Sequence, residues 1–303
     1  MPKNISMNPL SLGSLLLALG VAIIWGINFV MVKISLEQIP PLTLCSLRFL
    51  FASIPAIFFI RRPNLPWKTI IQYGSLTFAL QFSLLFAGMA AGVSPGVAAL
   101  ISQSQVFFSM FLAWILTQQK IGIWQILGAI VAFAGIGVIG LHKNIDCTLI
   151  GFLLLLGAAM FWSIGNCIAI NLKNVNMFAL VVWGSFIAFF PLSFTAWIVE
   201  HPLKIIIHPE LLAWTTILAV AYITYASTHF GYASWSWLLN KYPTASIVPF
   251  ALFSPIAAMI ASTLLFHESF ELWKGVATLL VTTGLCVNLF GQSLYLRLKN
   301  YRS

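Results

Sequence analysis

Five amide side chains lie deep inside long apolar runs of this sequence. They are Gln81, Gln103, Gln105, Asn28 and Asn166. An unpaired polar group in hydrocarbon is costly, so each amide requires a neighbouring helix, water or a solute as a partner. Amides both donate and accept hydrogen bonds, so the glutamines suit the ammonium and carboxylate of a zwitterion. We predict that all five contact a solute; the alternative is hydrogen bonding between helices, worth about 0.6 kcal/mol per bond.

Two tryptophans and one histidine share this deep placement. Trp25 and Trp162 lie well inside their runs, away from the membrane interfaces where tryptophan is usual. They are predicted to line a solute pathway, with simple core packing as the alternative. His229 is the one mid-run histidine, and its unperturbed pKa lies near neutral. It is predicted either to contact a solute and accept a proton or to remain neutral, bonded to a neighbouring helix.

Three charged residues complete the candidate set. Arg48 lies within an apolar run, and an intramembrane charge is by default a functional hypothesis. We predict contact with a solute or a gate, although its long stem could also reach the outer headgroups. Lys33 and Glu268 lie near the predicted outer surface, where they could pair across a closed gate. An exposed pair of this kind would contribute little energy.

Enzymatic chemistry is not indicated by the sequence. The segment from His267 to Glu271 resembles half of a zinc-protease motif but lacks the second histidine. There is no Gly-x-Ser-x-Gly motif, no pair of mid-run acids, and no cysteine spacing typical of a metal site. We therefore expect neither an enzyme nor a bound metal or cofactor. A scaffolding membrane protein is a further alternative, disfavoured by the many buried amides and tryptophans.

Composition determines the elements that must position these residues. Of 303 residues, 60% are hydrophobic and only 7% are charged, against about 25% charged in soluble domains. A helix that crosses a bilayer needs about 20 apolar residues. Ten such runs are present, predicting an all-α polytopic membrane protein surrounded by lipid. The predicted spans are Leu12–Val32, Leu42–Ile60, Ile70–Ala91, Gly96–Thr117, Ile123–Leu141, Leu149–Asn171, Met177–Val199, Leu211–Leu238, Ala245–Phe266 and Leu272–Phe290.

Basic residues indicate the orientation of these spans. The net charge of +9 is not gathered in a stripe of the kind that binds nucleic acid, and no nucleic-acid partner is expected. With the N-terminus inside, ten Lys and Arg residues fall on the inner side and four on the outer side. The positive-inside rule therefore predicts that both termini are cytoplasmic. The short tail after the last span is basic.

Two halves of the chain resemble each other. Trp25 and Trp162 each lie thirteen residues into their spans, at an offset of 137. Later matches recur at a constant offset of 149, and the twelve extra residues fall between the seventh and eighth spans. These later matches are Gln119 with Glu268, Gly128 with Ala277, and Gly135 with Gly284. We predict two five-helix repeats, at 1–145 and 146–303; since five is odd, the second is inverted, as in many transporters. Gly128, Gly135 and Gly137 are predicted to allow close helix approach.

Several motifs resemble those of one transporter family, the EamA family of the drug/metabolite transporter superfamily. They are Trp25-Gly-x-Asn28-Phe29-x-x-x-Lys33, Pro40-Pro41-Leu42, Arg48-Phe49, Gln103-x-Gln105-x-Phe107-Phe108, Tyr242-x-Thr244, Val248-Pro249 and Gly284-Leu285-x-x-Asn288. The resemblance covers nearly the whole chain. It implies ten helices, an inverted repeat and a bacterial inner-membrane location.

For activity, the resemblance implies export of amino acids or related small metabolites, such as O-acetylserine and cysteine or threonine. Other metabolites, sugars, nucleotides or drugs are alternative cargoes. The family often has Gly-Glu after the fourth helix, where this chain has Gln118-Gln119. No acidic residue lies at mid-span, so facilitated efflux and histidine-linked exchange both stay open. The oligomeric state stays open too.

Overall fold

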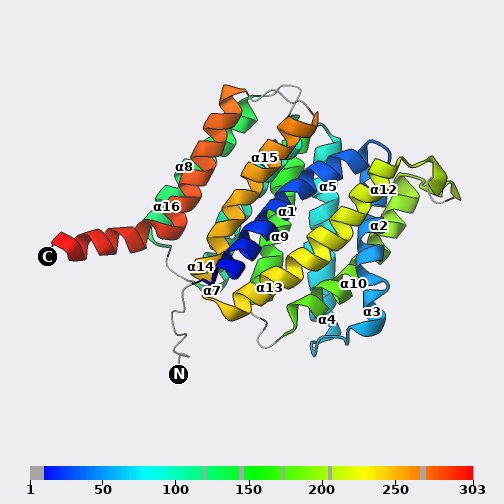
Figure 1. The fold of residues 1–303 in the computed structure, drawn as a ribbon, viewed down its shortest axis with the longest axis horizontal. Coiled ribbons are helices and arrows are strands. Elements are labelled where there is room, and N and C mark those ends of the chain that lie inside the picture. Colours follow the sequence, from blue (N-terminus) through cyan, green and yellow to red (C-terminus); the bar gives the residue numbers. More distant parts are fainter. Residues whose placement is uncertain are drawn as a thin grey trace.

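The computed structural model describes residues 10–118, 121–142, 147–170, 172, 175–203, 207–266 and 271–302, and the described part is built from helices (Figure 1). In chain order these are α1 (Leu12–Leu36), α2 (Pro41–Ser53), α3 (Ala56–Phe59), α4 (Trp67–Tyr73), the π-helical η1 (Gly74–Leu80), α5 (Gln81–Ala90), α6 (Pro95–Ser102), α7 (Gln105–Thr117), α8 (Ile123–Leu141), α9 (Leu149–Ile170), α10 (Met177–Val199), the 3₁₀-helical η2 (Pro209–Leu211), α12 (Trp214–Ala221), the π-helical η3 (Tyr222–Phe230), α13 (Gly231–Lys241), α14 (Thr244–Ile247), the 3₁₀-helical η4 (Val248–Leu252), α15 (Phe253–Phe266) and α16 (Leu272–Arg302).

In the part of the chain that the structure describes, ten helical segments are long enough to cross a membrane, which confirms the predicted all-helical membrane fold. Nine of those in the described part are also clearly apolar. The other, 214–241, runs without interruption through α12, η3 and α13. It is more polar because η3 contains Thr224, Ser227, Thr228 and His229. A span that carries so many polar groups needs protein or water beside it.

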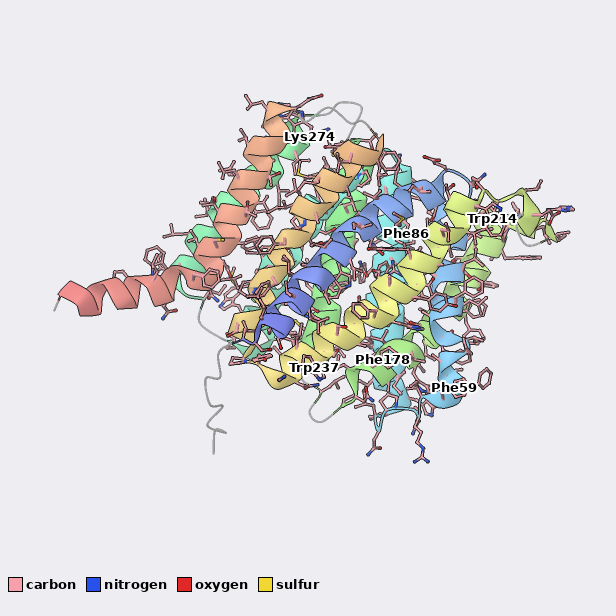
Figure 2. The ribbon with its side chains drawn as sticks, viewed as in Figure 1. Phe59, Phe86, Phe178, Trp214, Trp237 and Lys274 are labelled. Carbon is pink, nitrogen blue, oxygen red and sulfur yellow. The ribbon has the colours of Figure 1, made fainter. Side chains whose placement is uncertain are left out.

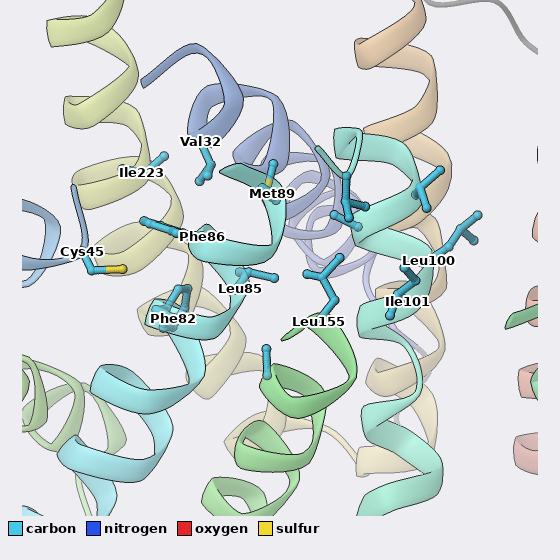
Figure 3. Close-up of a cluster of buried hydrophobic side chains, with 14 of the residues drawn as sticks. Val32, Cys45, Phe82, Leu85, Phe86, Met89, Leu100, Ile101, Leu155 and Ile223 are labelled. Carbon is cyan, nitrogen blue, oxygen red and sulfur yellow. The ribbon is translucent and has the colours of Figure 1, made fainter. Parts of the chain in front are cut away.

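The outer surface is apolar, as lipid contact requires. Large hydrophobic side chains project from the bundle, including Phe59 and Trp214, whose exposed fractions are 81% and 78% (Figure 2). Inside, a continuous hydrophobic cluster joins helices of both sequence halves (Figure 3). It includes Phe86 from α5, Leu155 from α9 and Ile223 from η3. The core is therefore shared by both halves of the chain.

Helices of the two halves interleave in pairs. The most extensive packing joins α8 to α16 and α2 to α10, in each case a helix and its counterpart in the other half. At the repeat offsets, α1 corresponds to α9 and α7 corresponds to α15. The packing of α1 on α15 therefore has its counterpart in the packing of α9 on α7. Side by side in Figure 1, α8 and α16 stand apart from the other helices.

Glycines bring α8 and α16 into backbone contact. A Cβ at Gly128 would lie 2.5 Å from the Gly284 carbonyl oxygen, and one at Gly135 would lie 3.0 Å from that of Ala277. The offset of 149 relates Gly128 to Ala277 and Gly135 to Gly284, so it converts each of these contacts into the other. The two helices run antiparallel. This is the relation that an inverted repeat produces. The predicted close approach is thus found at Gly128 and Gly135, whereas Gly137 faces open space and the prediction for it is wrong.

Four spans in the described part depart from a regular α-helix over part of their length. The π-helical segments η1 and η3 lie in the third and eighth spans, at places that overlap under the offset of 149. In the fourth span, α6 ends at Ser102 and α7 begins at Gln105. In the corresponding ninth span, Pro249 lies in the 3₁₀ segment η4. Such interruptions often mark functional sites, because they redirect side chains and free backbone groups.

Candidate functional site

A cavity lies among these interrupted spans. It contains about 130 Å³ of space that the centre of a water molecule can occupy. One water needs about 10–15 Å³ of such space, so a molecule of amino-acid size fits. Seven spans from both halves line it, whereas α8, α10 and α16 do not. The lining residues are Trp25, Asn28, Phe29, Arg48, Gln81, Phe82, Leu85, Ala99, Ser102, Gln103, Gln105, Ala158, Ala159, Trp162, Ser227, Tyr232, Ala251 and Ser254.

Arg48 supplies the charge of this cavity. Its side chain is 1% exposed, so it does not extend to the headgroups as the alternative prediction held. Nε and Nη2 donate to the Thr228 hydroxyl at 3.2 and 3.0 Å, and Nη1 donates to Asn28 Oδ1 at 3.5 Å. The guanidinium carbon lies 4.3 Å from the centre of the Phe82 ring, a cation–π distance. All of these partners are neutral.

Thr228 can hold Arg48 because of the helix geometry around it. Its hydroxyl donates to the Ile223 carbonyl at 2.9 Å, five residues earlier in the π-helical segment. The oxygen lone pairs are thereby left for the two guanidinium donors. Thr228 is itself buried. The π-helix of the eighth span therefore positions the cation of the second span.

Three predicted glutamines line the same cavity. Gln81 begins α5 directly after η1, and Gln103 and Gln105 flank the break between α6 and α7. Gln81 Oε1 and Gln105 Oε1 are buried, and neither accepts a hydrogen bond within the described part of the protein. A buried acceptor without a donor costs about 1–3 kcal/mol. Two residues of the cavity lining thus each carry a buried acceptor that lacks a donor in this conformation.

Aromatic rings form another part of the lining. Trp25 and Trp162 both reach the cavity, and Tyr232 lies near each of them, with ring centres 5.8 and 6.3 Å away. Trp25 Nε1 donates to the Ser227 carbonyl at 3.2 Å, which fixes the indole. Phe82 lies beside Trp162, with ring centres 6.5 Å apart. These rings give the cavity an apolar wall beside its polar groups.

Asn166 and His229 do not reach this cavity. Asn166 is exposed on α9. It lies one helical turn beyond Trp162, on the same face of α9 but beyond the residues that line the cavity. His229 is part-buried, and its Nε2 lies 2.7 Å from the Ala52 carbonyl. The structure thus places His229 in the helix-bonded alternative, between the second and eighth spans.

Of the predicted gate pair, only Lys33 lies within the described residues. Lys33 lies partly buried in the last turn of α1. Glu268 lies outside the described residues. Glu200, at the end of α10, is an acidic residue that contacts another span. Its carboxylate accepts hydrogen bonds from the backbone N–H groups of Leu42 and Thr43 at 2.8 and 2.7 Å, so it caps α2.

Sequence reasoning missed Tyr232, Thr228, Ser227 and Ser254. All except Thr228 line the cavity, and Thr228 binds Arg48. Three of the four belong to the eighth span. The high content of Ser, Thr and Tyr in that span was the available signal, since a lipid-facing helix has no need of it.

The buried cation Arg48 has no charged counterpart at the related position of the other repeat. At the offsets of 137 and 149, Arg48 corresponds to Ser185 and Thr228 to Ala79. Ser185 is buried and donates to its own helix, at the Val181 carbonyl. Of these related positions, only those in the second and eighth spans carry the cation, Arg48, and the hydroxyl that binds it, Thr228.

Together, the interleaved membrane-spanning helices and the polar cavity between them define a multi-pass membrane transporter. The model of the EamA-like transporter family matches the chain twice, over residues 12–141 and 149–290. This protein therefore belongs to the EamA-like transporter family and is not an enzyme. The double match also suggests a duplicated repeat.

Comparison with known proteins agrees with this assignment. The chain is 32% identical to a probable amino-acid metabolite efflux pump of Escherichia coli, over 91% of this chain and 94% of the relative. A protein of the same description in Salmonella typhimurium is also 32% identical, with the same shares of each chain covered. An uncharacterized transporter of Bacillus subtilis is 23% identical over 90% of this chain and 95% of its own length. A crystal structure shares the fold, with a TM-score of 0.60 and 14% identity over 91% of this chain and 97% of that one.

Proposed function

We propose that this protein exports amino acids or related small metabolites across the bacterial inner membrane. The observation that carries the proposal is the cavity itself, which combines a buried guanidinium, two free amide oxygens and aromatic walls. Cysteine-like or O-acetylserine-like solutes and threonine-like solutes fit this chemistry. Two relatives described as probable amino-acid metabolite efflux pumps support the same assignment.

The packing of the fourth and ninth spans supports transport by alternating access. The residues from Pro95 to Ile101 in α6 are all buried, and α6 packs on α15, where a Cβ at Gly96 would meet Met259. Beyond the break, α7 packs mainly on α9 and is largely exposed or half-buried. The bundle is thus tighter on the side of the cavity formed by α6 and α15. With both termini cytoplasmic, this tight side is the outer one.

Movement about the irregular segments of the third, fourth, eighth and ninth spans would open this tight outer side and close the inner one. The proposed inverted repeats, 1–145 and 146–303, exchange the roles of their fourth and ninth spans during this movement. The cavity residues Trp25, Asn28, Arg48, Gln81, Gln103, Gln105 and Trp162 are the proposed binding site. Asn166 and His229 are not among the residues that line it in this conformation.

Efflux in proteoliposomes tests the proposal. The purified protein is reconstituted, loaded with a panel of labelled amino acids that includes cysteine, O-acetylserine and threonine, and followed for release. Protein-dependent release of at least one of them is expected. If no amino acid is released but a labelled drug or sugar does leave the vesicles, the proposal is wrong and the protein exports the alternative class of cargo.

A further inference from the structure

The cavity holds a positive charge that the described part of the protein does not neutralise. Arg48 is bound by a hydroxyl, an amide and aromatic rings. No Asp or Glu occurs among the cavity-lining residues, and the ion pair between His208 and Glu210 lies outside the cavity. Glu200, on the neighbouring α10, is occupied in capping α2.

A buried cation of this kind costs energy unless an anion joins it. Removing water from a guanidinium costs several kcal/mol, and neutral hydrogen-bond acceptors recover only a part. A carboxylate matches the fork of guanidinium donors in shape and in charge. Because Arg48 lines the cavity, the anion can come from the solute itself.

The free amide oxygens complement this anion site. Gln81 Oε1 and Gln105 Oε1 are buried acceptors that lack a donor. An ammonium group has three donors and no acceptor, so it can satisfy both oxygens. The cavity therefore offers donors at Arg48 and acceptors at the glutamines within one small space.

We propose that Arg48 is the carboxylate anchor of the transported solute, and that Gln81 and Gln105 receive its ammonium group. This inference rests on the proposed export function and narrows it to α-amino acids with both groups free. Solutes that carry only a positive charge, such as amines, amino-acid esters and cationic drugs, are repelled by the guanidinium, whose charge they leave uncompensated. The selectivity is electrostatic, and the aromatic walls then set the size of side chain accepted.

Competition in the wild-type protein tests the anchor without any mutation. Proteoliposomes carrying labelled L-threonine are exposed, on the side that the cavity faces, to three competitors. These are unlabelled L-threonine, its methyl ester, which lacks the carboxylate, and N-acetyl-L-threonine, which lacks the ammonium. The two derivatives are expected to need at least about tenfold higher concentrations than threonine for equal inhibition. If threonine is not carried, the same derivatives of an amino acid released in the efflux panel are used.

Equal inhibition by the ester and the free amino acid would overturn the anchor, and so would equal inhibition by a cationic drug such as ethidium. Absence of flux for every amino acid is a different result, since it removes the export function itself. The two failures are therefore distinguishable.

Variants of Arg48 and Gln81 test which residue discriminates against each derivative. In Arg48→Gln, flux is expected to fall at least about tenfold, and the residual flux should no longer discriminate against the ester. Gln81→Leu should relax discrimination against the N-acetyl derivative while leaving that against the ester. The matched control is Arg61→Gln, an exposed arginine outside the cavity, which should change neither. If Arg48→Gln lowers flux but leaves the ester discrimination intact, Arg48 is structural and the proposal is wrong; if that variant does not fold, the wild-type competition decides.

Discussion

Arg48 directs two of its guanidinium nitrogens at a single hydroxyl, that of Thr228, 180 residues later in the chain. The two residues come from the second and eighth spans, and both are buried. The contact ties the charge of one half of the protein to the π-helical segment of the other. Any movement between the halves must therefore preserve or exchange this contact.

Replacing the Thr228 hydroxyl should impair both folding stability and transport. In Thr228→Val, the guanidinium loses the acceptor of Nε and Nη2, which we expect to cost about 1–3 kcal/mol. The apparent KM for the transported amino acid should rise, because the anchor is no longer held in place. Thermal unfolding in detergent and efflux kinetics measure the two effects. Thr228→Ser keeps the hydroxyl and should retain most of both; equal losses in the two variants would contradict the role of the hydroxyl.

The two asparagines should differ in their effect on transport. Asn28→Ala removes a buried amide that accepts from Arg48, so flux should fall several-fold. Asn166→Ala changes an exposed side chain and should leave flux close to that of the wild type. Efflux normalised to the amount of protein in the membrane measures both. Loss of flux in Asn166→Ala alone would place the solute path elsewhere.

His229 should be replaceable by a neutral donor. Glutamine can donate to the Ala52 carbonyl, as the imidazole does. Flux in His229→Gln, and its dependence on pH between about 5 and 8, should therefore match the wild type. His229→Phe removes the donor and should lower stability. A loss of pH dependence in His229→Gln would instead identify the histidine as a proton carrier.

Glycine contacts between α8 and α16 should control stability without touching the cavity. In Gly284→Val the added atoms meet the backbone of Gly128 and Ala132, and such overpacking costs typically about 1–3 kcal/mol. Gly137→Val enters open space on the same helix pair and should have little effect on stability. Unfolding temperatures of the two variants provide the comparison. Equal temperatures would mean that the close approach contributes little.

Removing the Glu200 carboxylate should weaken the start of α2. The carboxylate accepts from two backbone N–H groups and from the Thr43 hydroxyl. Glu200→Ala should cost about 1–2 kcal/mol, as for the loss of a helix N-cap. Glu37→Ala, an exposed acidic residue at the end of α1, is the control. An equal loss of stability in Glu37→Ala would contradict a specific capping role for Glu200.

The sequence by itself determined the class and the division into spans. Runs of about 20 apolar residues specify membrane helices, since any other backbone would leave unpaired groups in lipid. The same cost made buried polar residues informative, which is why Trp25, Gln81 and Gln103 were found in the cavity. Spacing alone placed Trp25 and Trp162 at related positions, and both line it.

The tertiary structure decided which residues of each helix meet the cavity. Asn166 lies one helical turn beyond Trp162 on the same face of α9, yet only Trp162 is among the lining residues, because tertiary packing sets how far the cavity extends along the helix. The partners of Arg48 also depended on the fold, because Thr228 approaches it only when the second and eighth spans pack together. Long-range packing and local π-helical geometry set these relations, and neither leaves a regular period in the sequence.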